Sequence, residues 1–128
     1  MIVDASALLA VFLREPERPR FRELIANAPE AVMSPVNFLE AAVRADALGK
    51  AESEGLDRLF ETSGIAIVPV TAQQAHLARE AYQKFGKGNH PAKLNLGDCF
   101  AYALAKTRSE PLLFKGNDFR LTDVEPAI

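Results

Sequence analysis

The chain has 128 residues, of which 48% are hydrophobic and 25% are charged, a balance that is typical of one compact globular domain. The net charge of −2 argues against a protein that coats nucleic acid through bulk positive charge, and the single cysteine, Cys99, excludes an internal disulfide and a cysteine-held zinc site. No apolar run approaches the roughly 20 residues that cross a bilayer. Because the chain opens directly with Met1-Ile2-Val3-Asp4, we expect a cytoplasmic protein without membrane contact.

The first half of the chain alternates short apolar runs with helical patterns. Residues 1–3 form an apolar run that stops at Asp4, and residues 5–13 carry apolar side chains at helical spacing, which predicts a strand followed by a helix. Prolines and an N-cap serine mark the next boundaries. The further predictions here are a helix from Pro19 that Pro29 ends, a strand at 31–33, and a helix that begins at Ser34-Pro35 and runs towards Gly49.

The second half repeats this alternation. Residues 65–70 are β-branched enough for a strand despite Pro69, Thr71 is a suitable N-cap for a helix over 72–85, and the polar residues 86–91 form the clearest loop. The remaining predictions are a helix over 51–60 that ends near Gly64, a helix from Asn95 or Gly97 to about Arg108, a strand at 112–114, a turn at 115–118, and a short helical turn with an edge strand in the last ten residues.

Strands separated by helices favour a parallel sheet, because each parallel connection needs a crossover of about a dozen residues. We therefore predict an α/β protein with a three-layer α/β/α fold and a central, mostly parallel sheet of about four or five strands. No repeat or linker indicates a second domain, so we expect one domain over residues 1–128. In such folds, sites form beyond the carboxyl ends of the strands.

Four acids occupy positions that this architecture would bring together. Asp4 ends the first strand, Glu40 lies one and a half turns into a helix, Asp98 opens another helix, and Asp118 follows the last strong strand. Magnesium prefers oxygen ligands and keeps several waters, so a few carboxylates can anchor it and leave positions for phosphate oxygens. The acids therefore point to metal-assisted phosphodiester chemistry, and local metal charge makes a modest net charge compatible with a nuclease.

Two of these acids also have a purely structural interpretation. Asp4 could cap the helix that follows it, because its side chain can accept the unpaired N–H groups of the first turn. Asp98 could occupy the third helical position behind an Asn95 cap, where a negative charge favours the helix dipole. Both interpretations stay open at this stage.

The other two acids, Glu40 and Asp118, also allow more than one interpretation. Glu40 lies among apolar residues and needs a partner for its charge, which Arg44 could supply as an ordinary i,i+4 ion pair. Asp118 belongs to a Gly-Asn-Asp sequence of a kind common in turns. Asp123, five residues later, is either a second candidate for the fourth acid or a cap.

Four segments in this order are specific as a set, although none is specific alone. They are Met1–Leu9 (MIVDASALL), Asn37–Ala41 (NFLEA), His90–Ala103 (HPAKLNLGDCFAYA), and Leu113–Phe119 (LFKGNDF) followed by Leu121-Thr122-Asp123. Together they resemble the PIN-domain toxins of bacterial toxin–antitoxin pairs, the VapC family, over essentially the whole chain.

This resemblance implies an endoribonuclease that uses Mg²⁺, or Mn²⁺, to activate water and that leaves a 5′-phosphate on one product. It implies metal-ligand roles for Asp4, Glu40 and Asp98, with Asp118 assisting directly or through water and Ser6 as a polar neighbour. Many relatives place an acid where Asn117 stands or vary the spacing around it, so Asn117 and Asp123 are possible supporting residues. The family further implies a VapB-like antitoxin that covers the site and a homodimer formed through helices near the N-terminal half.

Three alternatives remain beside this interpretation. A phosphatase that uses Asp4 as its nucleophile usually wants a second acid two residues on, where this chain has Ser6. A nucleotide-binding Rossmann domain would need a Gly-rich loop after the first strand, where this chain has Ala-Ser-Ala-Leu-Leu. A noncatalytic PIN-like module would bind RNA or a protein without cleaving it.

Candidate phosphate contacts fall in two groups of basic residues: Lys84, Lys87 and Lys93, and Arg14, Arg18, Arg20 and Arg22.

Overall fold

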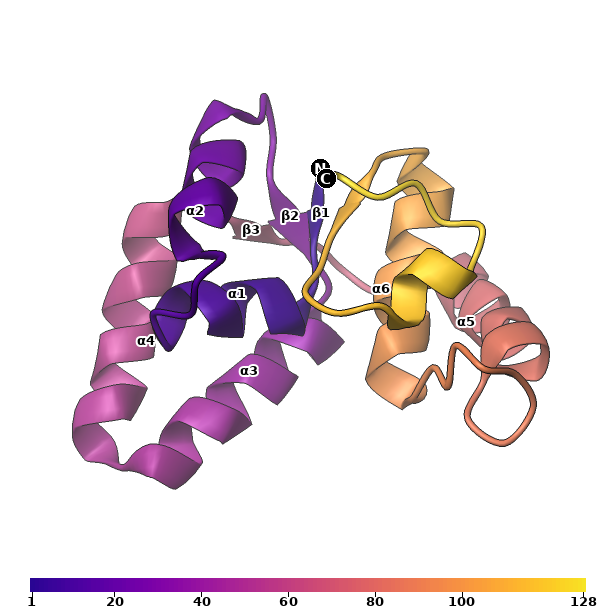
Figure 1. Ribbon diagram of the computed structural model, residues 1–128, viewed down its shortest axis with the longest axis horizontal. Helices are drawn as coiled ribbons and strands as arrows, with labels where there is room; N and C mark the ends of the chain where they lie inside the picture. Colours follow the sequence, from indigo (N-terminus) through magenta and orange to yellow (C-terminus); the bar gives the residue numbers. More distant parts are fainter.

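The computed structural model describes all of residues 1–128 and has a parallel four-stranded sheet at its centre (Figure 1). The strand order is β3-β2-β1-β4, and the register pairs Ile2 with both Val32 and Leu112. The strands are short: β1 is Ile2–Val3, β2 is Val32–Met33, β3 is Ala66–Ile67 and β4 is Leu112–Leu113. The predicted three-layer fold with a parallel sheet is confirmed.

Six α-helices connect and cover these strands. Side-chain caps start four of them, because Asp4, Ser34, Thr71 and Asn95 each accept a backbone N–H of the first turn. No helix is long and apolar enough to span a membrane. The helices are α1 (Ala5–Phe12), α2 (Arg18–Asn27), α3 (Pro35–Leu48), α4 (Lys50–Ser63), α5 (Ala72–Phe85) and α6 (Leu96–Arg108), and a 3₁₀ turn, η1, spans Asp118–Leu121.

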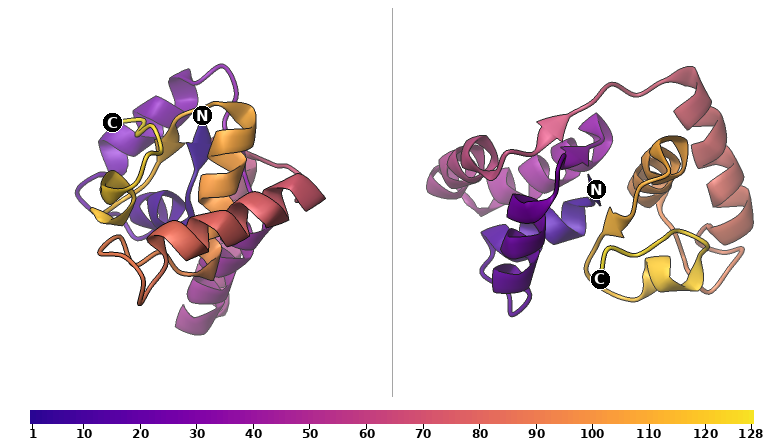
Figure 2. Two further views of the ribbon diagram at one scale, coloured as in Figure 1. Left: turned by 90° about the vertical axis from the view of Figure 1, so that its right-hand side faces the viewer. Right: turned by 90° about the horizontal axis from the view of Figure 1, so that it is seen from above.

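The sheet separates two apolar cores. Successive strand residues point to opposite faces, so Ile2, Val32 and Leu112 pack with α5 and α6, whereas Val3, Met33 and Leu113 pack with α1 to α4. Figures 1 and 2 show these two helical layers on either side of the sheet. Burial on both faces explains why β1, β2 and β4 are continuous apolar runs in the sequence.

The element boundaries differ from the predicted ones mainly at the edges. The strand expected at residues 65–70 shortens to Ala66–Ile67, both of which are exposed, as fits an edge strand that meets Pro69 two residues later. The helix expected over residues 51–60 extends over Lys50–Ser63 and ends at Gly64 in the left-handed conformation (φ 77°). Near the C-terminus, the edge strand reduces to one parallel bridge between Leu112 and Pro126.

Candidate active site

The carboxyl ends of the parallel strands meet at one edge of the sheet, and Asp4 lies there directly after β1. Its backbone N–H donates to the Leu113 carbonyl of β4 (2.9 Å), which fixes the point where the chain leaves the sheet. A pocket of about 590 Å³ opens beside it. The residues that line this pocket are Asp4, Ala5, Ser6 and Leu9 from the first segment, Val36, Leu39, Glu40, Val43 and Arg44 from α3, and Asn95 and Asp98 from the start of α6. We call it the acid pocket.

Asp4 is buried, with 4% of its surface exposed, and its two carboxylate oxygens have different surroundings. Oδ2 accepts from the backbone N–H of Ser6 (3.0 Å) and from its hydroxyl (2.5 Å). Oδ1 is buried and has no hydrogen-bond partner. Capping of α1 therefore occupies one oxygen and leaves the other unpaired, so the structural role of Asp4 is confirmed and leaves one oxygen for a ligand.

Ser6 connects Asp4, at the start of α1, to the segment after β4. While its hydroxyl donates to Asp4, its Oγ accepts from the backbone N–H of Lys115 (3.0 Å). The turn that carries Asp118 is thereby tied to the start of α1. The predicted place of Ser6 as a polar neighbour of the acids agrees with this geometry.

Glu40 is half-buried and is held by Asn37, one helical turn earlier on α3. The Asn37 amide nitrogen donates both to Glu40 Oε1 (2.9 Å) and to the Gly97 carbonyl of α6 (3.0 Å). Asn37 is fully buried, and its Oδ1 has no hydrogen-bond partner, so the two hydrogen bonds of its amide nitrogen are the ones that join the two helices, and losing them would be costly. Glu40 Oε2 has no protein partner, and the i,i+4 ion pair with Arg44 that the spacing allowed is not formed.

Gly97 gives the Glu40 carboxylate the room that it occupies. A Cβ atom on Gly97 would overlap Oε1, Cδ and Oε2 of Glu40, at separations that real Cβ atoms do not show. Glycine therefore lets the acid of α3 lie against the backbone of α6, immediately before Asp98. Sequence reasoning missed this role and that of Asn37, although an Asn three residues before a Glu within an apolar helical stretch was a usable signal.

Asp98 occupies the first turn of α6 and forms a capping box with Asn95. Its Oδ2 accepts from the Asn95 backbone N–H (3.0 Å), and its own backbone N–H donates to Asn95 Oδ1 (2.8 Å). Asp98 Oδ1 makes no hydrogen bond. Each of the three acids thus uses one oxygen for the fold and leaves the second free.

The pKa values of all three acids are raised, mainly by burial, and repulsion between the acids adds to the shift of Glu40 and Asp98. Burial raises the pKa of Asp4, against the hydrogen bonds from Ser6. Burial also raises the pKa of Glu40, to which the charge of Asp4 adds. The pKa of Asp98 rises to about 7, first through burial and then through the negative charges of Asp4, Glu40 and Asp118. Crowded like charges of this kind gain from a cation.

The remaining predicted residues, Asn117, Asp118 and Asp123, do not line the acid pocket and lie in two different places. Asp118 is exposed at the start of η1, close enough for its charge to raise the pKa of Asp98, but it does not line the acid pocket. Asn117 is exposed beside it and makes no side-chain cap. Asp123 lies elsewhere: Oδ1 accepts from the Tyr102 hydroxyl (2.7 Å) and Oδ2 pairs with Lys106 (3.2 Å).

These residues fit a hard divalent cation. The pocket offers three carboxylates with free oxygens, one of them the buried and partnerless Asp4 Oδ1, and neither histidine nor cysteine lines it. No three His, Cys, Asp or Glu side chains stand close enough to form a ready-made metal cluster. Magnesium reaches carboxylates partly through its waters, so a pocket of this width suits it better than a tight cage.

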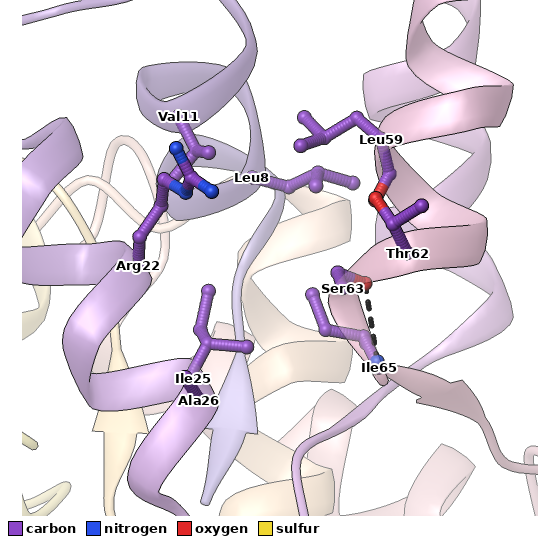
Figure 3. Close-up of a pocket in the computed structure, with 9 residues that line it drawn as sticks. All are labelled: Leu8, Val11, Arg22, Ile25, Ala26, Leu59, Thr62, Ser63 and Ile65. Carbon is purple, nitrogen blue, oxygen red and sulfur yellow. Dashed lines mark hydrogen bonds between the residues drawn. The ribbon is translucent and has the colours of Figure 1, made fainter.

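A second pocket has a different chemistry. It lies between α1, α2 and α4, has a volume of about 120 Å³ and is mainly apolar, with Leu8, Ile25 and Leu59 facing inward (Figure 3). Arg22 is its one charged residue, and no acid lines it. This pocket therefore lacks the carboxylates that the acid pocket brings together.

Comparison with known proteins identifies the family. A family model described as "PIN domain" matches residues 1–125. The chain is 45% identical over 125 residues to a protein named Ribonuclease VapC from Mycolicibacterium smegmatis, covering 97% of each chain.

Solved structures agree with the fold. Mycobacterium tuberculosis VapC20, titled a Sarcin-Ricin loop cleaving toxin, superposes with a TM-score of 0.74 at 16% identity over 98% of both chains. A toxin-antitoxin complex from Klebsiella pneumoniae gives a TM-score of 0.69 at 20% identity over 92% of this chain and 88% of the other. The resemblance read from the four segments of the sequence is confirmed: this chain belongs to the PIN-domain family, among the VapC ribonucleases.

Proposed function

We propose that this chain is a divalent-metal-dependent endoribonuclease and the toxin of a bacterial toxin–antitoxin pair. Its relatives at 45% identity are named as ribonucleases. The observation that carries the proposal is the set of free oxygens on Asp4, Glu40 and Asp98, which line one pocket at the carboxyl edge of the sheet. Three partly desolvated carboxylates with raised pKa values in one pocket are typical of an active site, which favours an enzyme over a noncatalytic module.

The three acids are the residues that would hold the cation. A bound divalent ion would lower the pKa of a water and neutralise charge that builds up on phosphorus. The chain itself contributes orientation: Ser6, Asn37 and Asn95 each hold one oxygen of an acid in place, so the other oxygen needs no rearrangement before it binds. Asp118, on η1, is proposed to assist at the rim directly or through water.

We propose Mg²⁺ as the metal, with Mn²⁺ as a substitute. All available side-chain donors are carboxylate oxygens, which suit both ions. A histidine or thiolate ligand would have favoured a softer metal, and neither lines the acid pocket.

The partners follow from the same proposal. A VapB-like antitoxin would cover the acid pocket and present a basic group to its carboxylates, as the anionic lining favours, and a toxin–antitoxin complex is among the structural matches. We further propose a homodimer, one domain over residues 1–128, and a cytoplasmic site of action, where RNA substrates occur.

Cleavage of cellular RNA by the purified chain tests the proposal. Total bacterial RNA would be incubated with the protein and Mg²⁺ or Mn²⁺, and new 5′ ends would be sequenced. Wild type should create discrete ends, whereas Asp98→Asn, which keeps the acceptor for Asn95, should create them about 10²–10³-fold more slowly. Asp57→Asn is the matched control, because Asp57 is exposed on α4 and outside the acid pocket. Binding of RNA without metal-dependent cleavage would favour the noncatalytic module.

A further inference from the structure

We propose that Arg44 binds a phosphate of the RNA next to the one that is cleaved, an inference that rests on the proposed function. Arg44 lies on α3, one helical turn after Glu40, and it is the one basic residue among those that line the acid pocket. An RNA strand whose phosphate enters this pocket carries further phosphates on either side. Arg44 is placed to meet one of them.

The guanidinium of Arg44 is not occupied by the fold. Its expected partner, Glu40, turns towards Asn37 and the backbone of Gly97 instead. Arg44 forms no salt bridge and no hydrogen bond, and its side chain is exposed. Among the causes that set the pKa of Glu40, the charge of Arg44 does not figure. A cation at the rim of an anionic pocket therefore stays free for an anionic ligand.

The surroundings of Arg44 suit a nucleotide. Leu39 and Val43 lie on the same side of α3, line the same pocket, and are 60% and 55% exposed. They offer an apolar surface for a ribose or base edge next to the charged group. An arginine is always protonated and can give two parallel hydrogen bonds to one phosphate, which fixes the strand relative to the acids.

Binding of RNA as a function of salt concentration tests the contact directly. The probe is a fluorescently labelled RNA pool of randomised sequence in Mg²⁺, and the protein carries Asp98→Asn so that the probe stays intact. Adding Arg44→Gln should weaken binding about tenfold and reduce the slope of log K against log salt by about 0.7–0.9, the value of one phosphate contact. Adding Arg58→Gln instead, an exposed and unpaired arginine of α4 outside the pocket, should change neither quantity.

Cleavage kinetics provide the second readout. In an otherwise wild-type chain that cleaves RNA, Arg44→Gln should raise KM more than it lowers kcat. Arg44→Lys should recover part of the lost affinity, because lysine keeps the positive charge but cannot give two parallel hydrogen bonds to one phosphate. An unchanged salt slope and an unchanged KM would overturn the role of Arg44 while leaving the nuclease intact. A wild type that cleaves no RNA would instead overturn the proposed function. A change in oligomeric state on Arg44→Gln, seen by light scattering, would also overturn the role by assigning Arg44 to contact with a second copy.

Discussion

Two carboxylates lie at opposite ends of α6, and their pKa values are shifted in opposite directions. Asp98 is in the first turn, where the helix dipole alone would favour its charge, yet its pKa rises to about 7 because it is buried beside Asp4, Glu40 and Asp118. Asp123 lies against the last turns of the same helix. Burial opposes its charge, but hydrogen bonds from Tyr102 and Lys106 and the charge of Lys106 outweigh burial and lower the pKa of Asp123.

Asp98 and Asp123 differ in how many of their carboxylate oxygens already have a protein partner. Both oxygens of Asp123 have protein partners, Tyr102 and Lys106, so this acid belongs to the packing between α6 and the C-terminal segment. Asp98 keeps one oxygen free and faces other acids across a pocket. Asp98 and Lys106 are eight residues apart on one helix, which corresponds to about 12 Å. An acid with a free oxygen among like charges is available to a cation, and an acid with filled oxygens is not.

The largest expected effect is on RNA cleavage. Asp98→Asn should lower the cleavage rate by about 10²–10³-fold, because it removes a charged metal ligand with little change in shape. Asp123→Asn should change the rate by no more than about twofold. Initial rates on total RNA under the same metal concentration measure both. A similar loss of cleavage rate in the two variants would mean that both acids act by supporting the fold. The two ends of α6 would then not differ in function.

The next effect is on stabilisation by metal. Mg²⁺ at about 100 times its Kd should add about 2.7 kcal/mol to the free energy of unfolding of a chain with one site. Thermal unfolding with and without Mg²⁺ should show this gain in wild type and in Asp123→Asn, and should show little of it in Asp98→Asn. Equal gains in all three chains would place the bound cation outside the acid pocket.

A third prediction concerns the close packing at the Asp98 end. Gly97→Ala forces a Cβ into the space of the Glu40 carboxylate, which must turn away and give up its hydrogen bond from Asn37, and loss of one such bond lowers the free energy of unfolding by about 0.5–1.5 kcal/mol. In a Glu40→Ala background the same change should cost much less, because the obstructing group is gone. Chemical unfolding of the four chains gives the coupling energy. A cost that is independent of residue 40 would trace the effect to the α6 backbone alone.

The fold and the positions of the three candidate acids could be predicted from the sequence, because local patterns determine them. Apolar runs mark the four strands, and caps and prolines mark most helix starts, so Asp4, Glu40 and Asp98 could be placed at strand ends and helix starts. The partners could not be predicted. Whether Glu40 pairs with Arg44 or turns towards Asn37 depends on the approach of α6, and only the missing side chain of Gly97 allows that approach.

The fourth acid shows the same limit. Asp118 and Asp123 belong to one short C-terminal segment, and nothing in the local pattern separates them. Their roles differ because Lys115 binds Ser6 through its backbone, which brings the Asp118 turn towards the acids, whereas Lys106 and Tyr102 of α6 hold Asp123 on the other side. Contacts between distant residues decide the assignment, and periodicity carries no information about them.

The smallest expected effect is the pH dependence of stability without metal. The folded pKa of Asp98 is about 7 and the ordinary value is 3.8, so between these pH values the folded chain holds a proton that the unfolded chain has lost. Stability in EDTA should therefore fall as the pH rises from about 4 to about 7. The lowered pKa of Asp123 acts in the opposite sense, because its contribution is lost only as the pH falls below 3.8.

Asp98 is partly exposed, so solvent screening should make its share of this dependence smaller than the full pKa difference implies. Denaturant unfolding over this pH range, in EDTA, measures it. Asp98→Asn should make the fall with pH shallower because residue 98 then has no proton to exchange, while Asp4 and Glu40, whose pKa values are also raised, keep part of it. Asp123→Asn should leave the slope above pH 4 unchanged. A wild-type curve that rises with pH over this range would mean that the acids of the pocket are stabilised by their charge, and the physical basis for metal binding at this end of α6 would be lost.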